Sequence, residues 1–183
     1  MLQIKSAETQ AEFQGILDLQ WENHLHTVTE SEKKEQGFVT VRHSMDQIQL
    51  MNSIAPHIIA KDGEKVVGYI LAMTKASKDL VPILIPMFAQ FDQLYYQGKR
   101  VSDFEYLVIG QICVGKSHRG QGLFDRMYAA YREAFSETYS FAITEIAKSN
   151  TRSLSAHRRV GFEVIHKFKD DLFDWAIVAW DWT

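Results

Sequence analysis

The stretch Glu105–Tyr131 reads EYLVIGQICV, GKSHRGQG and LFDRMYAAY, and it has three parts from which we work outward. An apolar run of strand length comes first, a basic turn spaced by glycines follows, and an amphipathic helix begins directly after the turn. A strand that delivers free backbone N–H groups to a helix N-terminus forms a binding site for an anion. We interpret this turn as a cradle for a pyrophosphate group.

Downstream of this stretch the pattern predicts a regular succession of elements. The helix after the turn is expected from about Gln121 to Ser136, with an apolar stripe of Leu123, Met127, Ala130 and Ala134. A strand is expected at 141–147, and a helix that Gly161 stops is expected at 151–160. Two strands at 162–168 and 173–180 then form a terminal hairpin. Trp175, Trp180 and Trp182 are expected to pack the last strand, with a homodimer contact as the alternative.

Upstream, the first third of the chain begins with a short strand at 2–5 and then has three helix starts. Three capping boxes mark these starts, at Thr9/Glu12, Thr29/Glu32 and Ser44/Gln47, with Gly37 ending the second helix. The first helix is expected to carry apolar residues as far as Trp21 and Leu25. A β-hairpin around Asp62-Gly63 follows, and 75–100 reads as an insertion with one short helix around Met87–Leu94.

Composition narrows the class of protein. The 183 residues suit a single domain, 1–183, and the mixture of elements predicts an α+β fold. A net charge of -3 argues against nucleic-acid binding, and no apolar run is long enough for a membrane span. With Cys113 as its only cysteine and no signal-peptide pattern, the chain is expected to be cytoplasmic.

The turn itself fits neither common nucleotide motif. It lacks both G-x-G-x-x-G and G-K-[ST], so an anion here would be held mostly by main chain. Gly120 and Gly122 stand where backbone comes close to a ligand or adopts positive φ. The alternative is that they serve tight packing only.

The letters RGQGLF resemble the R/Q-x-x-G-x-G/A signature of the GNAT N-acetyltransferase superfamily. The resemblance implies a three-layer fold with a central, mostly antiparallel sheet, and acetyl-CoA as co-substrate with no metal. It implies that the coenzyme's pyrophosphate binds at Arg119, Gly120, Gln121, Gly122, Leu123 and Phe124. It also implies that Ile112 and Val114 offer backbone groups to the pantetheine arm and thioester. Phe124 departs from the signature, because it stands at the G/A position.

A second stretch, TEIAKSNTRSLSAHRRVGF, resembles the family's next strand and helix. Asn150 and Gly161-Phe162 fall in the expected places, which implies a coenzyme-binding role for Asn150. Glu145, five residues before Asn150, matches the general base of the family's ribosomal-protein alanine acetyltransferases. The alternative for Glu145 is a solvent-facing or arginine-paired side chain, and Glu105 stays open as another base.

His157 lies seven residues after Asn150, where the family usually has a tyrosine that acts as general acid. Imidazole can donate a proton near neutral pH, so His157 is a candidate acid. It could instead hydrogen-bond the coenzyme or be a satisfied helix residue. For Cys113, in the middle of an apolar strand, a buried small side chain is favoured over a covalent nucleophile.

These residues predict an N-acetyltransferase that moves acetyl directly from acetyl-CoA to a primary amine in a ternary complex. Gln111 is expected to line the acceptor side. We expect a small-molecule amine, because the insertion at 75–100 would tend to cover the acceptor cleft. A non-catalytic acyl-CoA-binding or partner-docking module on the same fold is the alternative. His24 and His26 are too close in sequence to share a helix face, which argues against a metal site there.

Overall fold

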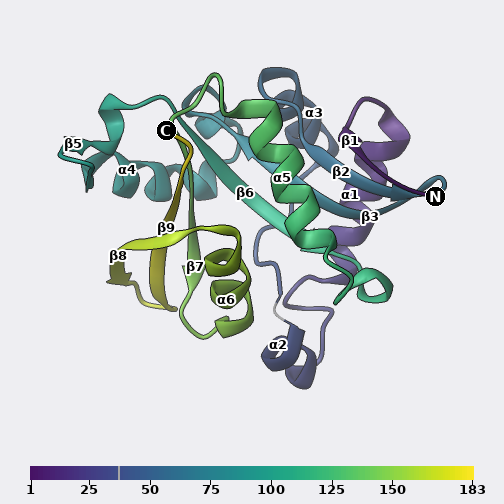
Figure 1. Ribbon diagram of the computed structural model, residues 1–183. Helices are drawn as coiled ribbons and strands as arrows, with labels where there is room; N and C mark the ends of the chain where they lie inside the picture. The colour runs from purple at the N-terminus through teal and green to yellow at the C-terminus, as the bar shows by residue number, and fades with distance from the viewer. Residues whose placement is uncertain (37) are drawn as a thin grey trace.

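A seven-stranded sheet forms the centre of the computed structural model, which describes residues 1–36 and 38–183 (Figure 1). The strand order is β1-β2-β3-β6-β7-β9-β8, and every neighbouring pair is antiparallel except β6 and β7. This is the mixed α+β, mostly antiparallel architecture that the sequence predicts. The strands are β1 (Leu2–Ser6), β2 (Ile58–Asp62), β3 (Lys65–Met73), β6 (Tyr106–Val114), β7 (Phe141–Ala147), β8 (Glu163–Lys169) and β9 (Asp174–Asp181).

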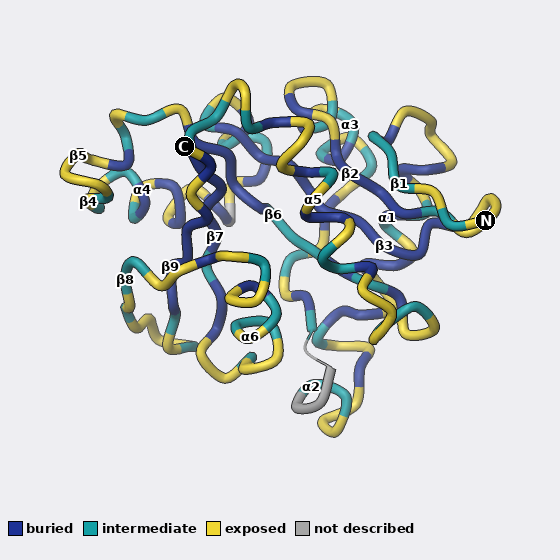
Figure 2. The backbone as a smooth tube through the Cα atoms, viewed as in Figure 1, coloured by how far each residue is buried: buried dark blue, intermediate teal, exposed yellow. Residues whose placement is uncertain are grey.

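Helices cover both faces of the sheet, so that the five inner strands, from β2 to β9 in the sheet order, are the most deeply buried part of the chain, while the edge strands β1 and β8 are more exposed (Figure 2). One apolar cluster joins the sheet to α1, α3 and α4, and a second joins the opposite face to α5. Each cluster has large side chains at its centre, Tyr69 and Phe91 in the first and Tyr128 and Tyr131 in the second. The helices are α1 (Gln10–Glu22), α2 (Glu30–Gln36), α3 (Met45–Ile54), α4 (Ile85–Gln93), α5 (Leu123–Phe135) and α6 (Thr151–Val160).

The predicted helix starts are confirmed. The reciprocal side-chain and backbone bonds of the capping box are present at Thr9 and at Ser44, and the same pair of bonds joins Thr29 to Glu32. The expected stop at Gly37 lies outside the described residues. The extent of the first helix was predicted wrongly, because α1 ends at Glu22 and leaves Trp21 44% exposed. Its buried stripe contains a polar residue, Gln20.

Two further predictions need correction. The insertion has more structure than one helix, because two 3₁₀ helices (Lys75–Leu80 and Pro82–Leu84) precede α4 and a short ribbon, β4 (Tyr95–Tyr96) with β5 (Lys99–Arg100), follows it. α5 starts at Leu123, two residues after the expected Gln121. Its buried face is made by Leu123, Met127 and three large aromatic residues, Tyr128, Tyr131 and Phe135, while Ala134 is exposed.

The feature that positions the site is a gap between β6 and β7. The two parallel strands pair only from Tyr106↔Phe141 to Val108↔Ile143 and then diverge, as Figure 1 shows. A β-bulge shifts the pairing of β6 with β3 at Gly110, which lies just past the last of these pairs. Across the start of the gap, Thr144 Oγ1 donates a hydrogen bond to the carbonyl of Ile109 (2.9 Å).

Among the described residues, no helix is both long and apolar enough to cross a membrane.

Candidate active site

A pocket of about 340 Å³ lies at the C-terminal end of β6, between the glycine turn and helix α6. It gathers nearly all of the residues expected to bind the coenzyme. They are Ile112, Val114, Arg119, Gly120, Gly122, Leu123, Phe124 and Asn150. Gln121 does not line the pocket, because its side chain turns back and donates to the carbonyl of Ser117 (2.9 Å). Only the backbone of Gln121 is therefore available for binding a ligand at the turn.

The glycines of the turn are favoured by backbone conformation rather than by lack of space. Gly120 and Gly122 have φ values of +72° and +71°, and a Cβ added to either would meet no atom within 4 Å. Gly122 is also the N-cap of α5, and no side-chain capping hydrogen bond is found at that helix end within residues 1–36 and 38–183. The first N–H groups of α5 are therefore left to a ligand, and the helix dipole favours an anion there. This geometry fits the diphosphate of a coenzyme.

The edge of β6 that faces the gap also presents backbone groups. Gly115 N–H donates to the Val67 carbonyl of β3 (2.8 Å), and hydrogen-bonded pairs in an antiparallel ladder alternate along each strand. By this alternation Ile112 and Val114 point their N–H and C=O groups away from β3, toward the gap. The Val114 carbonyl accepts a hydrogen bond from Arg119 Nε (2.9 Å). The backbone groups of Ile112 and Val114 are thus directed as the sequence comparison implies.

Arg119 is fixed from a second direction by a residue that sequence reasoning missed. Its Nη2 donates to the Oδ1 of Asn23 (2.5 Å), which is the buried C-cap residue of α1. Asn23 also donates to the Leu19 carbonyl (2.8 Å), so its amide group is held in orientation. Nothing in the local sequence marks Asn23 as a site residue, because it lies 96 positions from Arg119.

Asn150 caps a helix in addition to lining the pocket. Its Oδ1 accepts a hydrogen bond from Ser153 N (3.2 Å) and so caps the N-terminus of α6. Asparagine is among the strongest N-cap residues, which explains why the helix begins at Thr151. The cap holds the first turn of α6 against the pocket.

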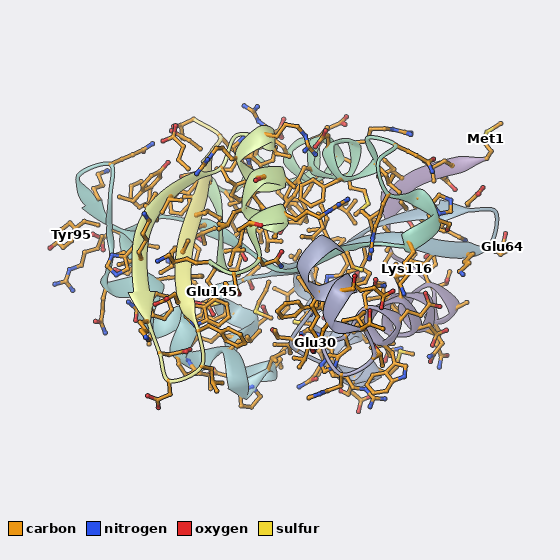
Figure 3. The ribbon with its side chains drawn as sticks, turned by 90° about the horizontal axis from the view of Figure 1, so that it is seen from below. Met1, Glu30, Glu64, Tyr95, Lys116 and Glu145 are labelled. Atoms are coloured by element: carbon orange, nitrogen blue, oxygen red, sulfur yellow. The ribbon has the colours of Figure 1, made fainter. Side chains whose placement is uncertain are left out.

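Glu145 lies on β7 two residues past the last β6–β7 pair, at the side of the gap. Its neighbours Ile143 and Ile177 belong to the cluster on the α1 and α4 face, so Glu145 faces that side of the sheet. Figure 3 shows Glu145 beside β8 and β9 and well apart from Lys116, and neither residue lines the pocket. Its Oε2 is buried and makes no hydrogen bond within the described residues.

Burial, together with a smaller contribution from the negative charge of Asp170, raises the pKa of the Glu145 carboxyl to about 7. Removal from water disfavours the ionised form, which is the main cause here. A carboxyl group with this pKa can gain and lose a proton near neutral pH. No arginine or lysine pairs with Glu145 among the described residues, so the salt-bridge alternative finds no support.

His157 is buried on the other face of the sheet and has both ring nitrogens in use. Tyr128 OH lies 2.7 Å from Nε2, and Nδ1 lies 2.8 Å from the Ser153 carbonyl. Because a carbonyl can only accept, Nδ1 carries the proton and Nε2 accepts from the tyrosine. Burial lowers the pKa of His157 to about 4. These contacts argue against the general-acid role that the sequence suggests.

The two residues that depart from the family pattern, Phe124 and His157, contact each other. The Phe124 ring packs edge-on against His157 (centroids 5.3 Å apart) and against Tyr128 (5.0 Å). Phe124 lines the pocket and His157 does not, so Phe124 lies between the pocket and the imidazole. The bulky residue at the signature's small position and the histidine at its tyrosine position form one packed unit.

Tyr128→Phe is expected to destabilise the protein by about 1–3 kcal/mol, because it leaves the buried Nε2 of His157 without a donor. Urea denaturation measures this loss. Tyr139→Phe is the matched control, since Tyr139 lies at the rim of the same apolar cluster and is only partly buried. Equal stability of Tyr128→Phe and wild type would contradict the assigned hydrogen bond.

The remaining candidates differ in their surroundings. Burial raises the pKa of the Cys113 thiol to about 12, which keeps it protonated and unreactive as a nucleophile. Glu105 is exposed and precedes β6, at the end of the strand opposite the pocket, which argues against it as a base. Among the described residues no group of three or more metal-ligating side chains is found.

Gln111 belongs to a buried polar network that the sequence did not predict. Its Oε1 accepts hydrogen bonds from Gln20 Nε2 (2.7 Å) and Tyr69 OH (2.6 Å), and its Nε2 donates to the Val41 carbonyl (3.0 Å). Gln20 also contacts His43 Nδ1 (2.9 Å). The one feature of the sequence that could have indicated this network is Gln20, a polar residue on the apolar stripe of α1. The network fixes Gln111 beside the gap, on the face that holds Glu145.

Comparisons with known proteins agree with this geometry. The model of the Acetyltransferase (GNAT) family matches residues 13–162. No curated protein matches the chain in sequence. The match begins within α1 and includes the glycine turn, Glu145 and α6, and so it includes every residue that lines the pocket.

Solved structures resemble the chain over nearly its whole length. The ribosomal-protein-S18-alanine N-acetyltransferase from Escherichia coli has a TM-score of 0.67 at 11% identity, over 100% of this chain and 95% of that one. The yncA protein from Salmonella typhimurium, solved with its cofactor acetyl-CoA, has a TM-score of 0.65 at 15% identity, over 100% and 95%. A chain of the NatC complex bound to Gag peptide and CoA has a TM-score of 0.66 at 13%, over 100% and 99%. At these identities the likeness establishes the fold alone.

Proposed function

Because the chain belongs to the GNAT acetyltransferase family, we propose that it is an acetyl-CoA-dependent N-acetyltransferase that acts on a primary amine of a small molecule. One observation carries the proposal. An uncapped helix N-terminus and a free strand edge line one pocket, and a buried carboxyl group lies at the side of the same gap. The helix N-terminus and the strand edge suit a ligand that carries both a diphosphate and a thioester. The buried carboxyl group suits an amine that must lose a proton.

The residues of the pocket have distinct parts in this proposal. Bound acetyl-CoA would supply the acetyl group as a thioester. The N–H groups from Gly120 to Phe124 would hold its diphosphate, with Arg119 adding positive charge. Ile112 and Val114 would align the arm along β6 through their backbone groups. The N–H groups at that edge would also stabilise negative charge on the thioester carbonyl oxygen during transfer.

Glu145 is the proposed base. An amine is a nucleophile only when neutral, so an acceptor that arrives as an ammonium ion must first give up a proton. A carboxylate whose conjugate acid has a pKa of about 7 can take this proton, and its buried Oε2 has a free lone pair. His157 takes no proton in this proposal and instead holds α6 against α5 through Tyr128.

The state of the one cysteine supports direct transfer. A protonated, buried thiol with a pKa of about 12 is a poor nucleophile at neutral pH. Cys113 lies in the pocket wall next to Ile112 and Val114, so no covalent acyl-enzyme is needed to explain its position. The amine would then attack the thioester carbonyl while both substrates are bound, the carbon–sulfur bond would break as the amide forms, and coenzyme A would leave as a thiolate that takes its proton from solvent.

The pH dependence of kcat/KM is expected to report Glu145. Only the ionised carboxylate accepts a proton, so kcat/KM should rise tenfold per pH unit below about 7 and level off above it. His157 should add no step near its ordinary pKa of about 6.5, because burial keeps it neutral there. An initial-rate profile from pH 5 to 9 makes the measurement. A flat profile would remove the buried base from the mechanism.

The acceptor class is tested by thiol release from acetyl-CoA over two panels. One panel contains small primary amines and polyamines, and the other contains short peptides with free N-termini. Structural neighbours are named for both kinds of acceptor, spermidine on one side and ribosomal protein on the other. The proposal expects turnover with the first panel. Turnover confined to peptides would overturn the small-molecule assignment, and binding without turnover on either panel would favour a non-catalytic module.

A further inference from the structure

Gln111 lies on β6 beside the gap, on the face of the sheet that holds Glu145. Its cross-strand partner Leu71 belongs to the apolar cluster on the α1 and α4 face, and cross-strand partners share a face. Gln111 is three residues past the last β6–β7 pair, Glu145 is two residues past it, and the bulge at Gly110 takes up one residue of β6. The two side chains therefore lie nearly level on either side of the gap, and Gln111 is only partly buried.

The amide group of Gln111 has one possible orientation, because backbone groups fix the network at both ends. At one end the His43 backbone N–H donates to Gln20 Oε1 (2.8 Å), so the other polar atom of that amide is nitrogen, and it donates to Gln111 Oε1 (2.7 Å). At the other end the Val41 carbonyl can only accept, so the atom of Gln111 that lies 3.0 Å from it is Nε2. Each end alone gives the same orientation.

This orientation leaves one hydrogen-bond donor of Gln111 without a partner. Oε1 accepts from Gln20 Nε2 and from Tyr69 OH (2.6 Å), which occupies both of its lone pairs. Nε2 carries two hydrogens, and one of them is donated to the Val41 carbonyl. The part of the chain that the structure describes provides no acceptor for the other hydrogen. Gln111 therefore offers a donor beside the gap and no acceptor.

His43, at the far end of the network, also has a donor without a partner. Its Nδ1 lies 2.9 Å from Gln20 Nε2, and because that nitrogen donates, Nδ1 accepts. Burial lowers the pKa of His43 to about 4, so the ring is neutral and carries its one proton on Nε2. The residue is 4% exposed, and within residues 1–36 and 38–183 this Nε2 has no hydrogen-bond partner. Donors thus exceed acceptors in the network, which favours a ligand that supplies an acceptor atom.

The charge on this face narrows the kind of acceptor atom. Glu145 is ionised when it acts as the proposed base, and the negative charge of Asp170 also acts on it. A carboxylate or phosphate on the substrate would be repelled by these groups. An ammonium group would meet the positive end of the N–H dipole at Gln111, and it has no lone pair to accept with. An uncharged oxygen fits both conditions.

We propose that Gln111 is a specificity-determining residue of the acceptor site, and that its free N–H binds an uncharged oxygen of the amine substrate, such as a hydroxyl, ether or amide oxygen. The proposal rests on the proposed function, since it takes the acceptor to be an amine that reacts beside Glu145. It narrows the substrate class to small amines that carry an oxygen close to the amino group. Polyamines are disfavoured, because their protonated nitrogens can only donate.

Thiol release from acetyl-CoA with three matched amines tests this substrate class. The three are 2-methoxyethylamine, butylamine and N-methylethylenediamine, which have an oxygen, a methylene and a secondary amino group at the same position of one chain. A second set, 3-methoxypropylamine, pentylamine and N-methyl-1,3-propanediamine, places the same three groups one carbon further from the reacting nitrogen. The amines differ in basicity, and this difference cancels when a kcat/KM ratio in wild type is divided by the same ratio in a variant.

Gln111→Glu changes the chemistry at one atom. Glutamate keeps Oε1 as the acceptor for Gln20 and Tyr69 and replaces the Nε2 donor by a negatively charged oxygen. In at least one set, the kcat/KM ratio of the methoxy amine to the alkylamine should fall by about 3- to 10-fold, the contribution of one hydrogen bond. The ratio of the diamine to the methoxy amine should rise. Gln111→Met removes the donor without adding charge, and it should lower the first ratio by a similar factor.

Gln3→Glu is the matched control, because Gln3 is an exposed residue of the edge strand β1 and should leave both ratios unaltered. Ratios that are the same in wild type, Gln111→Glu and Gln111→Met would overturn the role of Gln111 and leave the proposed function standing. No turnover of any primary amine by the wild-type protein would overturn both proposals. Each ratio compares two substrates on one sample, so partial unfolding of a variant does not alter it.

Discussion

Glu145→Gln is expected to lower kcat by about 10²–10⁴, the usual contribution of a general base, while the Kd for acetyl-CoA stays unchanged. Glutamine keeps the shape of the side chain but cannot accept a proton. Glu145 lies beyond the last β6–β7 pair and does not line the pocket that holds the glycine turn, so coenzyme binding should not depend on it. Initial rates at saturating acetyl-CoA, with calorimetry of the same samples, measure both quantities.

Glu105→Gln is the control, because Glu105 is the exposed carboxylate at the far end of β6 and should leave kcat unaltered. Loss of fold would not explain a low kcat in Glu145→Gln. The folded-state pKa of Glu145 is raised above its ordinary value of 4.5, so ionisation of this group costs stability as pH rises from about 4.5 through 7. Removing the carboxyl removes that cost. Full activity of Glu145→Gln would exclude Glu145 as the base.

Gly122→Asp is expected to weaken acetyl-CoA binding by about 100-fold. The substitution places a carboxylate at the N-cap of α5, where the proposal puts the diphosphate, and repulsion between charges about 4 Å apart costs about 1–4 kcal/mol. Aspartate is among the residues that tolerate the left-handed conformation that Gly122 adopts, and it is a good helix cap. Folding should therefore persist while binding is lost, as calorimetry and circular dichroism would show.

Gly122→Asn separates charge from shape. Asparagine has the same size, also tolerates positive φ and also caps helices, but it carries no charge. Its effect on the Kd for acetyl-CoA should be at least tenfold smaller than that of aspartate. Equal losses in the two variants would mean that bulk at Gly122, rather than charge, disturbs the pocket. Unimpaired binding by Gly122→Asp would place the diphosphate elsewhere.

The sequence predicted the elements around the glycine turn well because local signals set them. The capping boxes at Thr9 and Ser44, the positive φ of Gly122 and the stop at Gly161 each depend on residues a few positions apart. The order of strand, turn and helix then follows from periodicity. The family resemblance added the central, mostly antiparallel sheet, which periodicity alone does not specify.

The parts that were predicted poorly depend on contacts between distant residues. Asn23 reaches Arg119 across 96 positions, and Gln20 reaches Gln111 across 91, so no local pattern indicates either contact. The insertion was underestimated because 3₁₀ turns and two-residue strands have almost no periodicity. The stripe of α5 was expected to continue from Leu123 and Met127 through Ala130 and Ala134, whereas the fully buried residues of that helix include Tyr128 and Tyr131.

His157 shows how a matched position can mislead. Its spacing from Asn150 fits the family tyrosine, and an unperturbed imidazole would suit a general acid. The fold instead places the ring between Tyr128 and the Ser153 carbonyl, where both nitrogens are satisfied and the cation is disfavoured. Phe124, the other departure from the family pattern, packs against the same ring. Neither residue could be assigned this role without the structure.

Calorimetric titration of the purified protein with acetyl-CoA tests the central claim, that the turn at 119–124 binds the coenzyme. The account predicts one binding site per chain with a Kd below about 1 mM, in the range of common enzyme substrates, and loss of that binding in Gly122→Asp but not in Glu145→Gln. A folded wild-type protein that gives no binding heat with acetyl-CoA at several temperatures would contradict it.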